Sequence, residues 1–263
     1  MGLSLPTATA TGRGRGRAHV PPRDRFGGGR FCTGVRASSG ARVSMIRCAA
    51  ECDTRNSGPI CRIVRRVRFG VTISRVQAEI AAKRLAREGL TDRCQVICAD
   101  FAELPVEPHY DAMVAVEAVV HSPSLENLLP SLADRLRSGG RLILCDDWLT
   151  DKDRGLAARE RCLDQFRAGW RVGSLHTVAE LVAMSERAGL RLVEDLDLTS
   201  YLRLGRPRDH VIRLAVDATV VVPRLRDRLV EMPFWANMIG GSALQAALSR
   251  RWLEYHLIVL EKA

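Results

Sequence analysis

The sequence has no apolar run long enough to cross a membrane and no lysine in its first 69 residues. A membrane-spanning helix needs about 18 consecutive apolar residues, so an integral membrane segment is not expected. Residues 1–69 hold 14 arginines and three acids, Asp24, Glu51 and Asp53, which amounts to +11. The whole chain of 263 residues carries +10, which leaves −1 for residues 70–263. The basic character therefore belongs to the N-terminal segment alone.

Residues 1–65 also have few aromatic residues, Phe26 and Phe31, and no helical or strand period. They are rich in Arg, Gly, Ser, Thr and Pro, with the tracts GRGRGR and GGGR. Such a segment cannot bury enough apolar surface to offset its chain entropy, so we expect disorder up to about residue 60. Two functional readings stay open: an Arg/Gly tract that binds nucleic acid phosphates, and an organelle transit peptide.

Evidence for a metal site is weak. Cys48, Cys52 and Cys61 have a spacing that could bind zinc, but no fourth ligand lies at a familiar distance, so no metal is expected. Cys94, Cys98 and Cys145 flank or occupy predicted strands. Such cysteines behave as small buried hydrophobic residues. Reduced thiols of this kind predict a cytoplasmic protein.

From Val67 onward, short apolar runs alternate with amphipathic segments. The pattern predicts strands at 67–74, 95–100, 110–118, 141–148, 190–198 and 255–262. A first helix has Val76, Ile80, Ala81 and Leu85 on one face. A second follows the leucine stripe from 125 to 136, and a third begins at the capping box Thr177-x-x-Glu180. This alternation predicts an α/β fold with a mostly parallel sheet and helices on both faces.

In such sheets, ligands bind beyond the carboxyl ends of the strands, so the residues after each strand are the candidates. Ser74 follows one strand, with Gln77 one helical turn further on. Asp100 and Phe101 follow the next strand and pair a hydrogen-bond acceptor with a flat apolar ring, as a purine base requires. Simple helix capping would also explain Ser74 and Asp100.

The strand at 110–118 ends in polar residues that a core does not need. Glu117 terminates an apolar run, and burying an unpaired carboxylate is costly, so it should face a crevice or a partner. His121 follows four residues later. The segment Asp146–Trp148 ends the next strand and belongs to the same group of candidates.

Four motifs in order carry a resemblance to a known family. They are Gly70-Val71-Thr72-Ile73-Ser74 with Gln77, Ala99-Asp100-Phe101, VEAVVHSP from Val116 to Pro123, and LRSGGRLILCDDWLTD. From about Val67 to Ala263 the chain resembles class I S-adenosylmethionine-dependent methyltransferases. It is most similar to the branch of sterol C-methyltransferases, tocopherol-type and bacterial natural-product methyltransferases. The resemblance implies a Rossmann-like fold and S-adenosyl-L-methionine as cofactor.

The resemblance also implies roles for the candidates. Ser74 and Gln77 would lie along the ribose and methionine part of the cofactor, and Asp100 and Phe101 would hold the adenine. Glu117 would lie beside the cofactor.

His121 would face the acceptor. For an oxygen or nitrogen acceptor, His121 is the candidate base because its ordinary pKa is near neutrality. For a carbon acceptor, Glu117, Trp148 and Tyr201 are candidates for stabilising a cation.

The family's glycine-rich loop is missing from its expected place. About 20 residues before the Gly70–Ser74 corner, the sequence reads SMIRCAAEC, without glycine and without a preceding apolar strand. We therefore expect a degraded or absent first strand and cofactor loop, and weak cofactor binding. One hypothesis is that residues up to about Arg66 are read in the wrong frame. The other is a genuine, diverged protein with a weakened site.

The span 201–248 predicts a helical cap over the acceptor pocket, with Phe234, Trp235 and Met238 clustered in it. The expected organisation is thus a low-complexity segment, 1–65, and a methyltransferase-like domain, 66–263. An apolar cap and a near-neutral domain favour a small lipid-like, isoprenoid or aromatic acceptor over nucleic acid. The alternative is a non-catalytic methyltransferase-like binding protein. The oligomeric state is not predicted.

Overall fold

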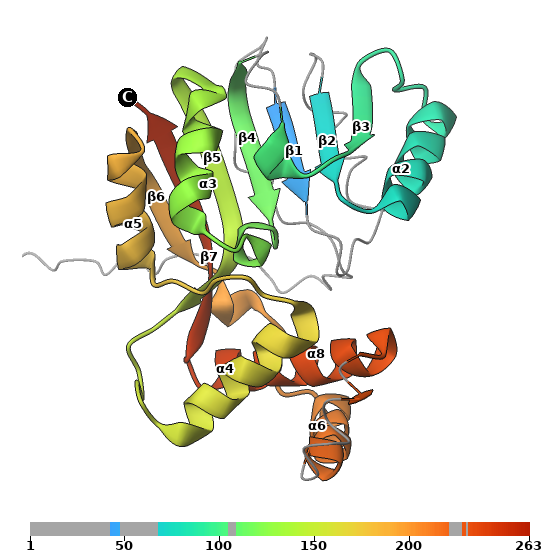
Figure 1. Ribbon diagram of the computed structural model, residues 1–263, viewed down its shortest axis with the longest axis vertical. Coiled ribbons are helices and arrows are strands. Elements are labelled where there is room, and N and C mark those ends of the chain that lie inside the picture. Colours follow the sequence, from blue (N-terminus) through green and yellow to red (C-terminus); the bar gives the residue numbers. More distant parts are fainter. Residues whose placement is uncertain (1–42, 48–67, 105–108, 221–227, 230) are drawn as a thin grey trace, which may run out of the picture. The chain divides into compact units, whose positions relative to one another are not determined.

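The computed structural model describes residues 43–47, 68–104, 109–220, 228–229 and 231–263 (Figure 1). They all belong to one unit of the chain, Arg36–Ala263. Apart from 43–47, the segment 1–65 lies outside the described residues, and so do Cys48, Cys52 and Cys61. None of the described helices is long and apolar enough to span a membrane.

The described residues form a seven-stranded sheet with the order β3-β2-β1-β4-β5-β7-β6. Its strands are β1 (Val43–Arg47), β2 (Arg68–Thr72), β3 (Cys94–Cys98), β4 (Tyr110–Val116), β5 (Leu136–Leu149), β6 (Leu190–Asp197) and β7 (Leu253–Lys262). The five strands from β3 to β5 pair in parallel. β7 pairs antiparallel with both β5 and β6. The sheet is therefore mixed, and the predicted parallel arrangement holds across β3 to β5.

The structure corrects the prediction of an absent first strand. Residues 43–47 form β1 in the middle of the sheet, where Met45 pairs with Gly70 of β2 and with Val114 of β4. The sequence signal is weak because VSMIR is short and not continuously apolar. The backbone N–H and C=O groups of such a short central strand are nevertheless hydrogen-bonded, because the strands on both sides pair with it.

Helices α2 (Arg75–Arg87) and α3 (Leu125–Asp134) cover opposite faces of the sheet. α2 connects β2 to β3 and α3 connects β4 to β5. These connections run in opposite directions along the strand order, so right-handed crossovers place the two helices on opposite faces. α5 (Val178–Arg187) contacts α3 and β6 and lies on the α3 side (Figure 1).

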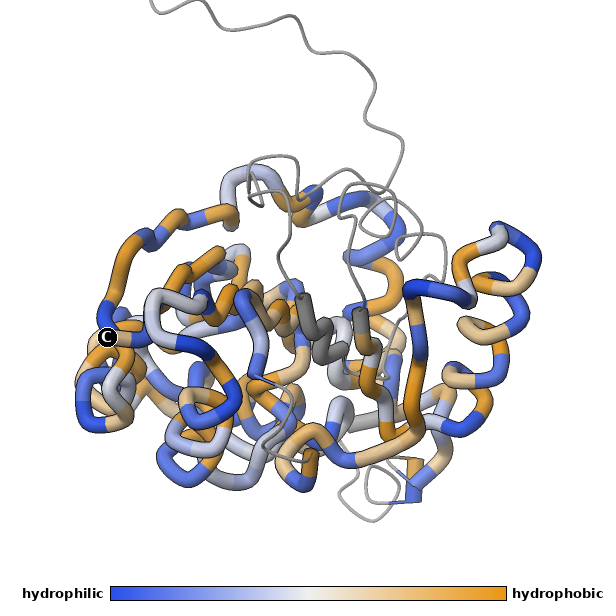
Figure 2. The backbone as a smooth tube through the Cα atoms, turned by 90° about the horizontal axis from the view of Figure 1, so that it is seen from above, coloured by the Kyte–Doolittle hydropathy of each residue, from blue (hydrophilic) through white to orange (hydrophobic). Residues whose placement is uncertain are grey.

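The main hydrophobic core lies between the sheet and the α3–α5 layer. Its fully buried members include Met113, Leu129, Leu132, Leu142, Leu144 and Leu181. α2 alternates hydrophobic and hydrophilic residues along its turns, at the right of Figure 2. Leu85 is buried as predicted, but Val76 and Ile80 are exposed, which corrects the predicted buried face. The principal contacts of α2 are with β3 and β2 at the end of the sheet, so only its C-terminal half is covered.

A second group of helices lies beyond the carboxyl ends of the parallel strands (Figure 1). It comprises α4 (Ala157–Trp170), α6 (Pro207–Val220) and α8 (Pro233–Ser249). α4 and α8 pack closely, because a Cβ on Gly169 would lie 2.4 Å from the Gly240 nitrogen. α6 and α8 fall within the predicted span 201–248, whereas α4 has no counterpart in the sequence prediction. Whether these helices cover an acceptor remains a prediction.

Most other predicted elements agree with the structure within a few residues. The capping box of α5 is present, with Thr177 and Glu180 each accepting a hydrogen bond from the other's backbone. One boundary differs: Leu136 was assigned to the leucine stripe of α3 but begins β5, after the helix ends at Asp134. Leu136 is fully buried in either role, so its hydrophobicity does not distinguish them.

Candidate functional site

The predicted residues lie at one edge of the sheet. β2, β3 and β4 are all parallel to β1, so Ser74, Asp100 and Glu117 follow strand ends that meet at the same edge. Neighbouring strands are about 4.8 Å apart, so β2 and β4, separated by β1, lie roughly 10 Å apart. This separation is compatible with a single ligand that contacts several strand ends.

Ser74 and Gln77 form a local hydrogen-bonded corner after β2. Ser74 is the N-cap of α2, and its Oγ accepts a hydrogen bond from the Gln77 backbone N–H at 3.4 Å. The Thr72 hydroxyl donates to Gln77 Oε1 at 2.9 Å and accepts from the Ser74 N–H at 3.2 Å. The capping interpretation of Ser74 is thus confirmed, and the corner holds the Gln77 amide at the strand end.

Asp100 and Phe101 begin the short helix η2 (Phe101–Glu103) after β3. Asp100 is exposed, and its Oδ1 accepts a hydrogen bond from the Ala102 N–H at 2.9 Å. The Phe101 ring is partly buried and packs against the main core. Helix capping therefore occupies one carboxylate oxygen of Asp100. The other oxygen and the Phe101 ring provide the hydrogen-bond acceptor and the apolar face proposed to bind adenine.

The turn after β4 is held by a buried acid from β5. Asp146 Oδ2 accepts hydrogen bonds from the N–H groups of Ala118, Val119 and Val120 at 3.0, 2.9 and 3.4 Å. Its Oδ1 accepts from the Asp147 N–H at 3.0 Å. Burial raises the pKa of Asp146 to about 7, although these backbone hydrogen bonds oppose the shift. Asp146 thereby fixes the turn that carries the predicted catalytic residues.

Glu117 is exposed and adopts a left-handed backbone conformation, with φ of 48°. Its backbone N–H donates to the Cys145 carbonyl at 2.8 Å. A non-glycine residue in this conformation costs about 1 kcal/mol, and such strain is concentrated at functional sites. The turn thus directs the Glu117 side chain out of β4 instead of along the strand.

His121 ends the short helix η3 (Val119–His121) and is partly buried. Its Nδ1 lies 3.3 Å from the carbonyl oxygen of Arg171, the left-handed C-cap of α4. Burial lowers the pKa of His121, so the ring is neutral at pH 7. A carbonyl oxygen only accepts hydrogen bonds, so the neutral ring carries its proton on Nδ1 and keeps a lone pair on Nε2.

Segment 171–174 packs directly against the same turn. The Gly173 N–H donates to the Val120 carbonyl at 2.8 Å, and Ser174 Oγ donates to the Ser122 carbonyl at 2.8 Å. A Cβ on Gly173 would lie 2.5 Å from the Ser122 oxygen, so only glycine allows this approach. The turn after β4 is therefore clamped between β5 and the chain that follows α4.

Sequence reasoning missed Tyr255, which reaches this site from β7. The Tyr255 hydroxyl donates to Glu117 Oε1 at 3.4 Å and accepts from the Cys145 thiol at 3.3 Å. The signal was obscured because Tyr255 is 138 residues from Glu117 in sequence and falls in an ordinary apolar strand pattern. Only the insertion of β7 beside β5 brings them together.

Of the residues considered for stabilising a cation, Trp148 does not suit that role. The Trp148 ring belongs to the main core, with 2% of the residue exposed, and Tyr201 is largely exposed on η4 (Thr199–Tyr201). In the predicted apolar cluster, Trp235 and Met238 pack around Ile239, whereas Phe234 is exposed. Within the described part of the chain, no group of three His, Cys, Asp or Glu residues could hold a metal ion.

Comparisons with known proteins show similarity to methyltransferases. Residues 56–140 match the model of a methyltransferase domain family. The chain is 31% identical over 172 residues to the methyltransferase GfsG of Streptomyces halstedii, covering 64% of this chain and 59% of that protein. It is 30% identical over 127 residues to a sterol 4-C-methyltransferase of Caenorhabditis elegans, covering 48% and 38%.

Over this part of its length the chain is similar to class I S-adenosylmethionine-dependent methyltransferases. It is related to sterol C-methyltransferases and natural-product methyltransferases, and it spans less than two thirds of the length of the two relatives above. The same fold occurs in a geranyl diphosphate C-methyltransferase from Streptomyces coelicolor A3(2). That structure has a TM-score of 0.58 at 14% identity and covers 84% of this chain and 72% of that one.

The methyltransferase family match begins at residue 56, after β1 and after the place where the glycine-rich loop is expected. The sequence following β1 has no glycine before Gly58. Residues 48–67 lie outside the described residues, so the cofactor site can be examined only from β2, β3 and β4. There, the side chains present fit the nucleoside part of the cofactor: an acid and a ring after β3, and a hydroxyl and an amide after β2.

Proposed function

We propose that this chain is a methyltransferase acting on a small lipid-like, isoprenoid or aromatic acceptor, with S-adenosyl-L-methionine as methyl donor. The observation that carries the proposal is the turn after β4. Asp146 and the 171–174 segment hold Glu117 and His121 at the same sheet edge as Ser74 and Asp100. The names of the relatives, which include sterol and geranyl diphosphate methyltransferases, support the acceptor class.

The cofactor supplies an electrophilic methyl group, and the chain supplies alignment and proton transfer. Ser74, Gln77, Asp100 and Phe101 would hold the nucleoside. His121 would take the proton of a hydroxyl or amine acceptor through Nε2, because its Nδ1 faces the Arg171 carbonyl. A base that is neutral at pH 7 is available without a prior deprotonation step.

The chain as written would bind the cofactor weakly, because its sequence has no glycine-rich loop after β1. In this family that loop allows the backbone to approach the cofactor closely. Calorimetric titration with S-adenosylmethionine is expected to show no binding tighter than millimolar. Micromolar affinity would overturn the proposed impairment but not the proposed activity.

Two further measurements test the frame hypothesis and the role of His121. Reading the other two frames around codons 20–66 tests the frame hypothesis, which fails if neither encodes an apolar strand followed by a glycine-rich loop. In a version with an intact loop, His121→Ala should lower methyl transfer about 100-fold or more to an oxygen acceptor. Unchanged turnover would remove His121 as the base. No turnover in either version would favour the alternative, a non-catalytic binding protein.

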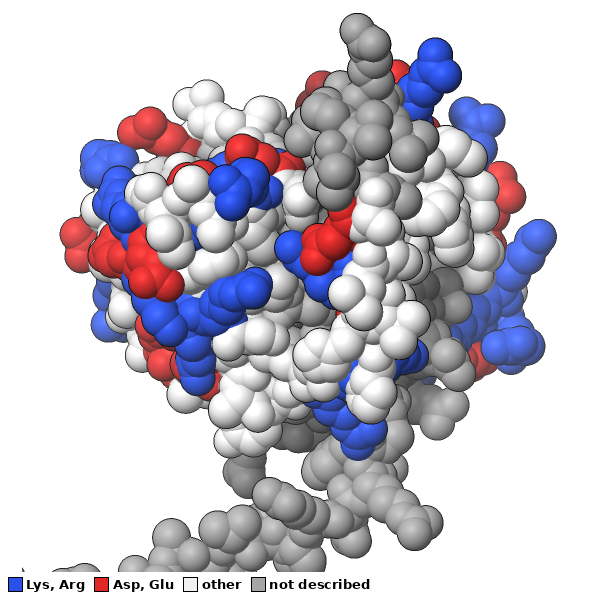
Figure 3. Space-filling model, turned by 90° about the horizontal axis from the view of Figure 1, so that it is seen from below, with Lys and Arg blue, Asp and Glu red and all other residues white. Residues whose placement is uncertain are grey.

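The surface supports a small-molecule acceptor. Seen from below, on the side of the helical group, Lys and Arg side chains are interspersed with Asp and Glu among uncharged residues (Figure 3). A protein that follows nucleic acid phosphates presents a basic stripe instead. We also propose a cytoplasmic location, because Cys98 and Cys162 are free thiols.

A further inference from the structure

Two adjacent acids near the end of β5 differ in their hydrogen bonding. Asp146 accepts four backbone hydrogen bonds. Asp147 is also buried, with 4% of the residue exposed, but its Oδ1 has no hydrogen-bond partner within the described structure. A buried carboxyl oxygen without a hydrogen-bond partner destabilises the fold. A bound ligand that supplies the missing partner would explain why an acid occupies this position.

The strand register shows what lies around Asp147. Alternation along β5 places Ile143, Cys145, Asp147 and Leu149 on one face, and Asp147 is paired directly across from Tyr255 of β7. Ile143 belongs to an apolar cluster with Val114 and Val259. At the other end, Leu149 and Tyr255 pack against the apolar cluster of α4 and α8. Asp147 is thus a polar group between two apolar surfaces.

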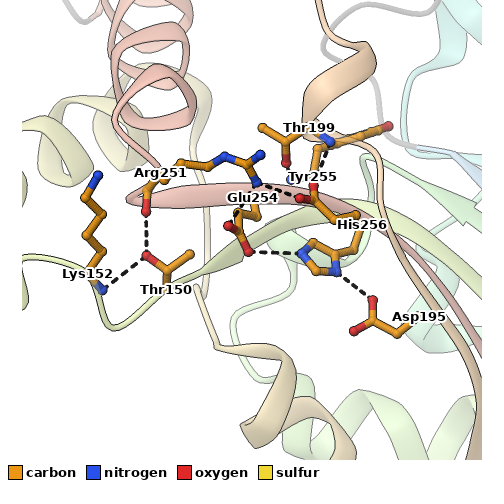
Figure 4. Close-up of polar contacts among 9 residues, drawn as sticks. Thr150, Lys152, Asp195, Thr199, Arg251, Glu254, Tyr255 and His256 are labelled. Atoms are coloured by element: carbon orange, nitrogen blue, oxygen red, sulfur yellow. Dashed lines mark hydrogen bonds and ion pairs between the residues drawn. The ribbon is translucent and has the colours of Figure 1, made fainter.

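Tyr255 is held rigidly beside Asp147. Its backbone N–H donates to Thr199 Oγ1 at 2.8 Å, and its carbonyl accepts from the Leu198 N–H at 2.7 Å. Arg251, just before β7, bridges Asp197 at the end of β6 and Glu254 of β7 at 2.6 and 3.0 Å. Figure 4 shows Arg251, Glu254 and Tyr255 together. The Tyr255 hydroxyl in turn reaches Glu117. Asp147 therefore lies next to the candidate site, on the side of the helical group.

The Asp147 carboxyl favours its protonated, hydrogen-bond-donating form more than an ordinary aspartate does. Burial, with the negative charges of Asp146 and Glu117 nearby, raises the pKa of Asp147 well above its usual range. A protonated carboxyl donates its O–H to an oxygen atom, whereas it gives no strong ion pair with a cation. The apolar surfaces on both sides favour a ligand that is mostly hydrocarbon.

We propose that Asp147 binds an oxygen atom of the acceptor, a hydroxyl or carbonyl group on an otherwise apolar isoprenoid-type molecule, with Tyr255 lining the same polar spot. This inference rests on the proposed function, because it names the feature of the acceptor that the methyltransferase would recognise. Asp147 would position the acceptor and would not take part in proton transfer, which is assigned to His121.

The first test needs no ligand and uses the neighbouring acid as a matched control. Asp147→Leu removes an unpartnered polar group and should raise the melting temperature of the full chain by about 2–6 °C. Asp146→Leu leaves four backbone N–H groups without their acceptor and should lower it by at least as much. A loss of stability in Asp147→Leu equal to that in Asp146→Leu would overturn the proposal, because Asp147 would then be a structural residue.

The second test measures the binding of two probes that differ by one hydroxyl. The native chain should bind farnesol at least tenfold more tightly than farnesene, its hydrocarbon counterpart, as followed by tryptophan fluorescence. In Asp147→Leu this preference should disappear, while binding of farnesene is retained. Equal affinities in the native chain, or binding of neither probe, would overturn the proposal. Because neither measurement requires methyl transfer, a failure of the proposed activity would remain distinguishable.

Discussion

Glu117 is a non-glycine residue in a left-handed backbone conformation at the candidate site. With φ of 48° it occupies a region that glycine adopts freely and that a glutamate adopts at a cost of about 1 kcal/mol. Glu117→Gly should therefore be about 1 kcal/mol more stable than Glu117→Ala, although both lose the contact with Tyr255. Urea denaturation of the two variants measures this difference. Equal stability would show that the conformation is unstrained.

The residues at the strand ends show which parts of the site can be predicted from the sequence. Ser74, Asp100, Glu117 and His121 were identifiable because each follows an apolar strand of a sheet that the sequence predicts to be mostly parallel. Tyr255 could not be identified, and Asp147 was a candidate only as part of the segment Asp146–Trp148, since the pairing of these two residues arises from the β5–β7 register. The relation between Asp146 and the turn after β4 was hidden for the same reason, as it joins residues 26 to 28 positions apart.

The crossing of α4 and α8 depends on glycines and gives a prediction at the scale of elements. A Cβ on Gly169 would lie 2.6 Å from the Ala236 carbonyl oxygen, whereas a Cβ on Gly241 would meet Trp170 at an ordinary 3.7 Å. Gly169→Ala should therefore lower the free energy of unfolding by about 1–3 kcal/mol. Gly241→Ala should leave it unchanged or raise it by up to about 1 kcal/mol, as an alanine in a helix does. Chemical denaturation compares them, and equal effects would contradict the close crossing.

Elements with a clear period were the easiest to predict, and short or irregular ones the hardest. The strands from β2 to β7 were expected near their observed places because their apolar residues are continuous or alternate. β1 was missed because its five residues owe their structure to pairing on both sides. α4 was missed because its charged residues mask a stripe made by Cys162, Leu163 and Phe166.

For the whole molecule, the buried acids predict how stability depends on pH. The pKa of Asp146 is raised from 3.8 to about 7, so the folded chain holds this proton more tightly than the unfolded chain. That contribution is complete below about pH 4 and is lost as the pH rises through 7. Asp147 acts in the same direction. Stability should therefore fall between pH 5 and pH 8, by on the order of 2–4 kcal/mol.

Urea midpoints at constant ionic strength across this range measure the effect. His121 acts in the opposite sense, because burial lowers its pKa and its neutral form is favoured as the pH rises. Asp147→Asn isolates the carboxyl contribution, since it removes one of the two acids and should flatten the decline. A native chain that becomes more stable from pH 5 to pH 8 would contradict the assignment of protonated acids at the end of β5.

The insertion of β7 between β5 and β6 determines the order in which the sheet can be completed during translation. β6 is synthesised before β7, and β7 is its neighbour in the described sheet. Until the ribosome has released Leu253–Lys262, β6 has no strand to pair with in the described sheet and β5 presents an open edge. Open edges of apolar strands recruit other chains. Nascent chains stalled within α6 or α8 should consequently be the species most in need of chaperones.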